Sequence, residues 1–499
     1  MADRDDEETE GLLPGTGTAC PMKILGPEDD NSDVAWRVTG SCLGLLASSY
    51  NILAADLVTS MMQDLYGNLI FTDAARHFMW GLQLSGLVSG MVGFGLASDL
   101  LGRRWTSVIS AGLITLGAIA GVLTVPSGSS GSTANLPWEF GLCRFVMGLG
   151  AGGEFPLAVT VTADAARGME SRGQLLAVLA SMHGLSMLLL GGVCFGAFTL
   201  QLSNEAMWRL MLAVGTLPAW EAAFLRLRME TSGPYSDVAW RFEDVLSTTS
   251  RAMAQGRRPL WKQQFRQLGK AVEIYWQQLL AAMAVWLLMN ASLHRVGTLR
   301  GHLLGHSLGY DGLAPEGKAR ADARFLLISG TVATAGFAIA IMLVKRVGPG
   351  ALQLYGFLGT AAAFFAASLT LGQAPKDGLL ACLGVALLSM SLGPRTATLV
   401  DPTEAFPACA RGTFVGLCAA CGELGVLLGD HVRSLSETGS VTPTVLIHCG
   451  SLALLGAGAS VLFGRREGDR CVLESPRLAA RVRLDLYGHH ARCDFQGGF

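Results

Sequence analysis

The sequence predicts an all-α membrane protein of about a dozen hydrophobic helices, and three observations carry that prediction. Of the 499 residues, 51% are hydrophobic and only 15% are charged, whereas about a quarter of the residues of a soluble domain are charged. The mean hydropathy is positive, at +0.41. Apolar windows of about 20 residues, long enough to cross a bilayer, recur along the chain. Lipid is therefore the expected solvent for most of the chain.

The apolar windows fall into two groups, separated by a polar stretch that is rich in Arg. The first group lies near 38–62, 79–98, 105–125, 138–163, 173–200 and 208–227, and the second near 271–293, 324–344, 350–372, 377–400, 413–431 and 443–463. We therefore predict two six-helix bundles joined by a loop. The predicted parts are an acidic N-terminal tail over 1–36, bundles over 37–227 and 271–464, a central loop over 228–270 and a C-terminal tail over 465–499.

The distribution of Lys and Arg predicts the orientation of the helices. Basic residues gather in alternate connections, and short loops of this kind stay in the cytoplasm, so both tails and the central loop are expected there. The first tail lacks the basic start and short apolar core of a signal peptide. Within it, Glu8, Leu12 and Leu13 resemble an acidic dileucine sorting signal. The plasma membrane is the expected location, and a vacuolar or lysosomal membrane is the alternative.

Composition and motifs argue against several classes of function. The net charge is -2 and no basic run stands out, so nucleic-acid binding is not expected. Cys418 and Cys421 form a CxxC on an apolar helix without a second pair of ligands nearby, so no metal site is predicted. Neither a Walker phosphate loop nor a recognisable hydrolase constellation is present. We expect no enzymatic activity and no cofactor; the expected partners are a small solute or ion, the proton and the lipid bilayer.

The loop after the second window reads Gly-Leu-Ala-Ser-Asp-Leu-Leu-Gly-Arg-Arg, from Gly95 to Arg104. Gly95 permits close helix contact, Asp99 can pair with a basic residue or cap a helix N-terminus across the bundle interface, and Gly102 lets the chain turn. The pattern resembles the GxxxDxxGRR loop of the major facilitator superfamily, whose fold has two six-helix bundles. By this resemblance, the residues expected to latch the bundles are Gly95, Asp99, Gly102, Arg103 and Arg104.

The fourth window places two charged residues, Arg144 and Glu154, in one apolar helix. Burying such charges is costly without partners or water, so both are functional candidates, and a structural ion pair is the alternative for either. The sequence Gly-Gly-Glu-Phe-Pro-Leu-Ala over 152–158 resembles the GGDYPLS of phosphate:proton symporters. A similar sequence with Glu occurs in sugar porters. The resemblance implies that Glu154 carries protons and that Phe155 belongs to the substrate site.

Two loop segments support the resemblance to phosphate:proton symporters. Residues 230–238 are similar to that family's ETPRYTADV, and residues 404–413 are similar to its ExFPxxxRGT. The likeness therefore extends over both halves of the chain. It adds Glu404 and Arg411 to the residues expected in the latch.

The chain departs from the symporter pattern in the predicted substrate site. In the first window the family has Tyr-Asp and a later Asn, whereas here Asn51 comes first and Asp56 follows. Because position 56 comes five residues after position 51, the carboxylate lies about 140° further around the helix than in the family. In the seventh window Trp286, Asn290 and His294 stand where the family has Trp, Asp and Tyr.

Three further positions differ from the family: His183 replaces a Gln, Arg395 follows Gly-Pro in place of an Asn, and Glu423 replaces a Lys. The planar guanidinium of Arg395 is a strong donor to oxyanions, although a carboxylate such as Glu423 is an alternative partner for it. His183 can titrate near neutral pH, or it can be a packing residue.

These residues favour a secondary active transporter that couples protons to the movement of inorganic phosphate or a similar anion. The coupling residues expected are Glu154, Asp56 and Arg144, and the substrate-binding residues expected are Arg395, His183, Trp286, Asn290, His294, Asn51, Phe155 and Glu423. A proton-coupled transporter of a sugar or another organic solute is the first alternative, because sugar porters share the Gly-Gly-Glu sequence. A nutrient sensor that does not transport is the second, because acids are missing at Asn51 and Asn290.

Overall fold

The computed structural model describes residues 31–67, 72–124, 136–167, 169–228, 260–308, 315–370, 376–408, 410–434 and 443–468. Within these ranges every regular element is an α-helix. Twelve stretches of the described chain are long and apolar enough to cross a membrane. The prediction of an all-α protein with about a dozen spanning helices is therefore confirmed. Glu8, Leu12, Leu13 and the segment 230–238 lie outside the described residues.

The N-terminal half forms the helices α1 to α7. Their bounds are α1 Asn31–Tyr66, α2 Asp73–Leu101, α3 Arg103–Leu123, α4 Leu136–Ala165, α5 Arg172–Thr199, α6 Asn204–Val214 and α7 Thr216–Arg228. α6 and α7 form one span together, because the helix is interrupted only at Gly215. This interruption frees backbone groups within a span, where they need partners.

The C-terminal half forms the helices α9 to α15. Their bounds are α9 Leu260–Leu308, α10 Pro315–Val347, α11 Pro349–Thr370, α12 Lys376–Leu392, α13 Pro394–Ala405, α14 Arg411–Ser434 and α15 Pro443–Gly468. Gly393 interrupts the tenth span and Pro394 begins α13, where its missing N–H is not needed. The tenth span is therefore broken at the Gly-Pro pair that precedes Arg395. α13 continues past the expected residue 400 and ends at Ala405, because Phe406 is extended before Pro407.

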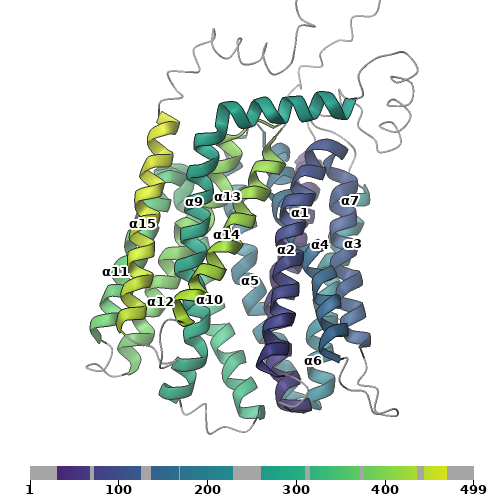
Figure 1. Ribbon diagram of the computed structural model, residues 1–499, viewed down its shortest axis with the longest axis vertical. Helices are drawn as coiled ribbons and strands as arrows, with labels where there is room; N and C mark the ends of the chain where they lie inside the picture. Colours follow the sequence, from purple (N-terminus) through teal and green to yellow (C-terminus); the bar gives the residue numbers. More distant parts are fainter. Residues whose placement is uncertain are drawn as a thin grey trace, which may run out of the picture.

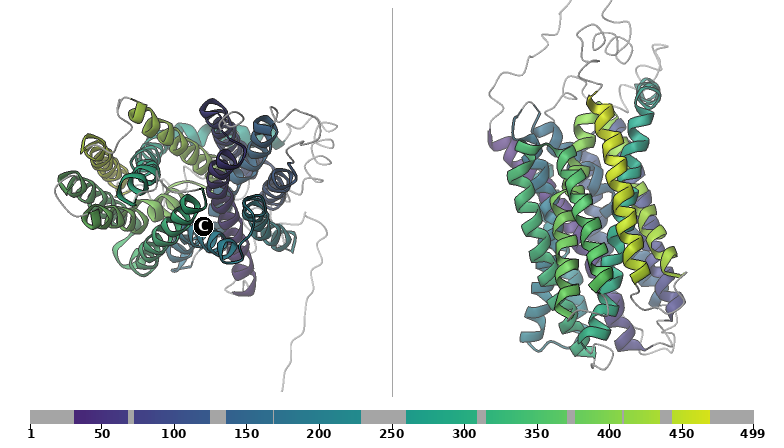
Figure 2. Two further views of the ribbon diagram at one scale, coloured as in Figure 1. Left: turned by 90° about the horizontal axis from the view of Figure 1, so that it is seen from below. Right: turned by 90° about the vertical axis from the view of Figure 1, so that its left-hand side faces the viewer.

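The helices run side by side, and the first turns of α9 lie across one end of the molecule (Figure 1). Seen along the helices, the N-terminal half in purple and blue and the C-terminal half in green and yellow occupy opposite sides (Figure 2). α2 packs against α14, and α5 packs against α10. The fold is therefore two helical bundles that meet across an interface. We call the end of the molecule at which α2 passes into α3 the Gly102 end.

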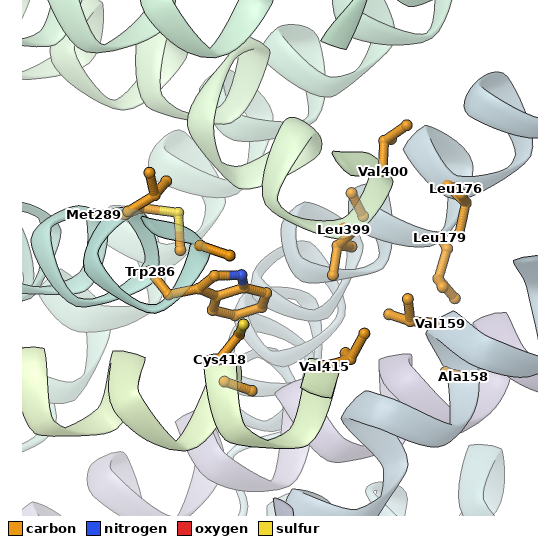
Figure 3. Close-up of a cluster of buried hydrophobic side chains, with 14 of the residues drawn as sticks. Ala158, Val159, Leu176, Leu179, Trp286, Met289, Leu399, Val400, Val415 and Cys418 are labelled. Carbon is orange, nitrogen blue, oxygen red and sulfur yellow. The ribbon is translucent and has the colours of Figure 1, made fainter. Parts of the chain in front are cut away.

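A cluster of buried hydrophobic side chains joins the two bundles. In Figure 3, Val159 of α4 and Leu179 of α5 lie on one side, and Leu399 of α13, Val415 of α14 and Trp286 of α9 lie on the other. Lipid tails are as apolar as these side chains, so close packing, more than the exclusion of water, holds such an interface together. The cluster therefore depends on the shape of the two bundle surfaces.

The outer surface of the bundles carries large apolar side chains. Leu123, Ile328 and Leu369 are 68%, 67% and 76% exposed. A broad exposed apolar surface is unusual for a soluble protein, whereas a bilayer solvates it. The chain is a multi-pass membrane protein.

Candidate functional site

A cavity of about 460 Å³ lies between the two bundles. Side chains of α1, α2, α4 and α5 line it from one bundle, and side chains of α9, α10, α12, α13 and α14 line it from the other. Among the lining residues are several that the sequence singled out, namely Asp56, Phe155, His183, Trp286, Asn290, Arg395 and Glu423. Residues far apart in the chain thus converge on one site at the bundle interface.

Arg395 lines the cavity from the first turn of α13, just after the break at Gly393. Within the described part of the chain Arg395 makes no ion pair, and its buried Nη1 has no hydrogen-bond partner. The indole Nε1 of Trp286, which lines the cavity from α9, is also buried without a partner. Buried donors without partners are costly. Two N–H donors, one of them charged, are therefore available to a bound anion.

Aromatic rings form one wall of the cavity. The ring of Phe155 lies edge-on to the Trp286 ring, with the centroids 5.3 Å apart, and edge-on to the His183 ring at 6.0 Å. Such edge-to-face pairs stabilise the relative position of the rings. Phe155 and His183 come from α4 and α5 of the N-terminal bundle, and Trp286 comes from α9 of the C-terminal bundle. The wall therefore forms only where the two bundles are in contact.

Asp56 and Arg144 form an ion pair at the edge of the cavity. Asp56 Oδ1 lies 3.7 Å from Arg144 Nη2, and the Asp56 side chain is 55% exposed whereas that of Arg144 is 3% exposed. The Arg144 guanidinium also lies over the Phe140 ring, 5.4 Å from its centroid. Asp56 lines the cavity and Arg144 stands behind it. A change in the charge of Asp56 would therefore act directly on a buried cation.

Glu154 lies away from the lining of the cavity, in a buried ion pair with Arg226 of α7. Its two carboxylate oxygens accept hydrogen bonds of 2.6 Å from Arg226 Nη1 and Nη2. Arg226 also donates to the carbonyls of Gly40 and Ser107. The pair therefore links α1, α3, α4 and α7. This is the structural arrangement that the sequence analysis left open as the alternative for Glu154, whose role as a proton carrier stays a prediction.

Sequence reasoning missed Arg226, although a signal was present. Arg226 lies near the end of the sixth apolar window, where a basic residue is usually attributed to the adjoining loop. The side chain is 2% exposed, so it points into the bundle. A buried Glu needs a partner, and an Arg at the end of another span is a candidate for it, so pairing Glu154 with Arg226 could have been considered from the sequence.

Asn51 and His294 are not brought into the cavity by any described contact. Asn51 is fully buried, and its Nδ2 donates to the carbonyls of Ala47 at 2.8 Å and Gly215 at 2.9 Å. The Gly215 carbonyl belongs to the break between α6 and α7. The side chain of His294 lies outside the described part of α9. Their expected roles in substrate binding stay predictions.

At the Gly102 end, Asp99 joins α2 of one bundle to α14 of the other. Asp99 Oδ1 accepts from the backbone N–H of Gly412 at 3.1 Å, and Oδ2 accepts from the N–H of Thr413 at 2.7 Å and from its hydroxyl at 2.9 Å. These N–H groups belong to the first turn of α14, where they lack partners within the helix. The structure therefore has the cap across the interface that the sequence allowed for Asp99.

Two glycines make this contact possible. Gly102 has φ 91°, a conformation that residues with a Cβ rarely adopt, and it separates α2 from α3 by one residue. A Cβ on Gly95 would lie 2.7 Å from the carbonyl oxygen of Gly412, which is too close for any other residue type. The small residues of the motif therefore allow the backbones of α2 and α14 to approach each other.

A second carboxylate at the Gly102 end, Asp164 of α4, pairs with two arginines. Arg411 Nη1 of α14 lies 2.7 Å from Asp164 Oδ1, and Arg103 of α3 pairs with the other oxygen. Arg103 also donates to the carbonyl of Ala408, at 3.3 Å. Arg411 and Arg103 thus join the bundles, and their role as a latch stays a prediction. Sequence reasoning missed Asp164, because an acid at the end of a span carries no signal of its own.

The remaining predicted latch residues differ in their contacts. Arg104 donates to the carbonyl of Leu227 within its own bundle. Glu404 is exposed at the end of α13, beside Thr403, whose carbonyl accepts from Arg172 of the other bundle at 2.8 Å.

Further contacts join the two bundles at the Gly102 end, near the start of α5 and the end of α10. Gln174 Nε2 donates to the carbonyl of Ile341 at 3.2 Å. Lys345 Nζ donates to Glu170 Oε2 at 2.7 Å, and this ammonium holds the pKa of the exposed Glu170 carboxyl below its ordinary value. Exposed pairs stabilise little individually. Together with the contacts of Asp99 and Asp164, they join the two bundles at the Gly102 end.

The described residues hold no group of three or more His, Cys, Asp or Glu side chains that could bind a metal ion. Cys418 is buried in the interface cluster, and Cys421 is half-buried on the same helix. Both are free thiols.

Two bundles of spanning helices, a cavity between them and contacts that join them at one end are the features of a membrane transporter of the alternating-access type. Comparison with known proteins agrees. The profile of the Major Facilitator Superfamily matches residues 39–429, and the chain belongs to that family. The predicted major facilitator fold is confirmed.

Curated relatives and solved structures extend the comparison. The chain is 24% identical over 432 residues to a Toxoplasma gondii protein named "Inorganic phosphate transporter PT2", covering 85% of this chain and 70% of the relative. It is 27% identical over 443 residues to "Probable inorganic phosphate transporter 1-10" of Oryza sativa subsp. japonica, covering 78% and 77%. The proton:xylose symporter XylE of E. coli, bound to 6-bromo-6-deoxy-D-glucose, superposes with a TM-score of 0.67 at 17% identity, covering 85% of this chain and 94% of that one.

Proposed function

We propose that this protein is a secondary active transporter that couples the movement of protons to that of inorganic phosphate. The observation that carries the proposal is Arg395: a guanidinium in the interface cavity, without an ion pair among the described residues and with a buried donor that has no partner. A charge at this depth needs a counter-ion. A bound oxyanion supplies one, and the Trp286 N–H adds a second donor to it.

The resemblance to phosphate transporters supports the choice of oxyanion. Curated relatives from two distant organisms carry the name inorganic phosphate transporter, and each alignment covers more than three quarters of this chain. Phosphate presents several oxygens to the planar guanidinium and is held well by neutral N–H donors. His183 and Asn290, which also line the cavity, complete the polar set proposed for binding.

The proton is proposed to bind at carboxylates of the N-terminal bundle. Asp56 lines the cavity and pairs with Arg144, so its protonation would change the charge at the substrate site. Glu154, the carrier implied by the family resemblance, is held by Arg226. Both stay candidates, and the variants Glu154→Gln and Asp56→Asn separate them.

The remaining parts of the proposal concern the surroundings of the transporter. The Gly102 end is proposed to face the cytoplasm, and the gathering of Arg103, Arg104 and Arg411 there supports this. The plasma membrane is the proposed location, and a vacuolar or lysosomal membrane is the alternative. Transport is proposed to proceed without a cofactor and without covalent chemistry.

Uptake into proteoliposomes tests the proposal. The purified full chain is reconstituted, and radiolabelled phosphate is supplied with and without a proton gradient across the membrane. We expect accumulation that requires the gradient and that Arg395→Gln abolishes, while empty liposomes accumulate none. Accumulation of a labelled sugar alone would favour the organic-solute alternative. Phosphate binding without flux, in protein that is correctly folded, would favour a sensor.

A further inference from the structure

We propose that the cavity accepts phosphate monoesters with an apolar, preferably aromatic, substituent, and that it binds them more tightly than inorganic phosphate. This inference rests on the proposed function, because it requires an oxyanion at Arg395. It goes beyond that function in assigning a second part of the substrate to the apolar walls of the same cavity. Three features of the site carry it: its volume, the placement of its charges and its aromatic wall.

The cavity is larger than inorganic phosphate requires. A water molecule in the liquid occupies about 30 Å³, so a cavity of about 460 Å³ holds the equivalent of about 15 waters. Phosphate has about five non-hydrogen atoms and fills about a third of that space, whereas a phenyl ester with about eleven fills most of it. Cavities of about 300–1,000 Å³ are typical of sites for organic ligands.

The cavity has one cationic side chain, Arg395, among the described lining residues. Two carboxylates, Asp56 and Glu423, border the same space, and Asp56 is already paired with Arg144, so neither part of the cavity offers a positive charge to an anion. The anionic group of a substrate is therefore confined to the surroundings of Arg395, with the hydroxyl of Thr398 one turn further along α13. The rest of the volume has to be filled by neutral groups or by water.

The remaining walls are apolar. α10 contributes Phe325, Leu326 and Phe337, and α1 contributes Ile52 and Leu53. Water in contact with such walls gains few hydrogen bonds, so its displacement by an apolar group is favourable. A substrate that carries an apolar group beside its phosphate satisfies both parts of the cavity at once, which inorganic phosphate does not.

The aromatic residues favour a flat substituent. Phe155 stands edge-on between Trp286 and His183, at 5.3 and 6.0 Å. Trp286 also carries the indole N–H that lacks a partner. One side chain thus offers a donor to the phosphate oxygens and a ring face to the group attached to them. An aromatic ester places its ring against this wall and its oxygens beside the N–H.

Competition for phosphate binding tests the inference. Binding of radiolabelled phosphate to the purified full chain is measured against unlabelled phosphate, methyl phosphate, phenyl phosphate and benzyl alcohol. We expect phenyl phosphate to compete about tenfold better than methyl phosphate, and benzyl alcohol not to compete. Phe325→Ala, which removes a ring from the wall, should lower this ratio about threefold to tenfold. Phe195→Ala is the matched control, since that ring is 53% exposed on the outside of α5.

The outcomes separate this inference from the proposed function. If phosphate binds and the two esters compete equally, the inference is wrong and phosphate transport stands. If phosphate neither binds nor is taken up by correctly folded protein, the proposed function fails, and the inference fails with it. Competition by benzyl alcohol would show binding of the ring alone and would also contradict the inference. The comparison of methyl and phenyl phosphate uses the unaltered protein, so the test holds even where Phe325→Ala does not fold.

Discussion

The buried pair of Glu154 and Arg226 makes opposite predictions for two roles of Glu154. If Glu154 carries the proton, Glu154→Gln should fold normally and lose accumulation driven by the gradient. If the pair is structural, the same variant should lose stability, because the buried Arg226, 2% exposed, is left without a charged partner. The structure favours the second outcome, since both carboxylate oxygens are engaged and neither reaches the cavity.

The magnitude follows from the two hydrogen bonds of 2.6 Å. Removing one partner of a buried ion pair costs about 3–5 kcal/mol. Gln keeps one oxygen that accepts from Arg226, so the cost should fall at the lower limit, about 3 kcal/mol. For a bundle of this size that corresponds to a melting temperature lower by roughly 6–12 °C. Arg226→Gln should be destabilising too, and the double variant should recover part of the loss, because two amides can hydrogen-bond to each other.

Thermal melting of the purified protein, followed by intrinsic fluorescence, measures these differences, and proteoliposome uptake is measured in parallel. Glu205→Gln is the matched control: Glu205 pairs with Arg209 at 3.0 Å but is 55% exposed, so its loss should cost less than about 1 kcal/mol. A Glu154→Gln protein that melts like the unaltered chain and fails only in gradient-driven accumulation would refute the structural role and restore Glu154 as the carrier.

Three further variants test the site and the latch. Arg395→Lys should weaken phosphate binding about tenfold or more, the equivalent of about 1.5–3 kcal/mol for a charge-assisted hydrogen bond; unchanged affinity in folded protein would remove the main argument for an oxyanion. Asp56→Asn should abolish accumulation under a proton gradient and keep exchange of phosphate without one; retained accumulation would exclude Asp56 as the carrier. Asp99→Asn should lower turnover with little change in affinity, because Asp99 caps α14 outside the cavity; an equal fall in affinity would contradict a latch.

The spanning helices were predictable because a bilayer sets the length and composition of each span. The break at Gly393 and Pro394 was also predictable, since Pro ends a helix and can begin the next one. The interruption at Gly215 was not. A glycine within an otherwise continuous apolar window gives no local sign of a break, and the break depends on the partner that Asn51 provides from α1.

The candidate site was only partly predictable. Charged and polar residues in apolar windows identified most of the cavity lining, because a charge at that depth requires a partner or a polar space. Whether such a residue pairs with another side chain or faces the cavity depends on packing between distant segments. Glu154 meets Arg226, 72 residues further on, and Arg411 meets Asp164 of the other bundle. Neither pairing leaves a local pattern, so the sequence could not separate buried ion pairs from residues that face the cavity.

The exchange of acid and amide on α1 shows how position on a helix determines the role of each residue. Asn51 lies where two carbonyls, of Ala47 and Gly215, need a donor. Asp56, about 140° around the helix, faces the cavity beside Arg144. A carboxylate at position 51 would face two carbonyl oxygens and be repelled by them. An amide at position 56 would leave Arg144 without a negatively charged partner. Each residue type therefore fits its surroundings.

This fit gives a last prediction. Asn51→Asp should destabilise the protein by about 1–3 kcal/mol, the cost of buried polar groups that lose their partners, and should add no proton coupling. Combined with Asp56→Asn, it should give a protein that melts at a lower temperature and does not accumulate phosphate under a proton gradient. Melting and uptake of the two variants measure both effects. A double variant that stays stable and accumulates phosphate would show that the carboxylate works from either side of α1, and the placement of the acid would then carry no meaning for coupling.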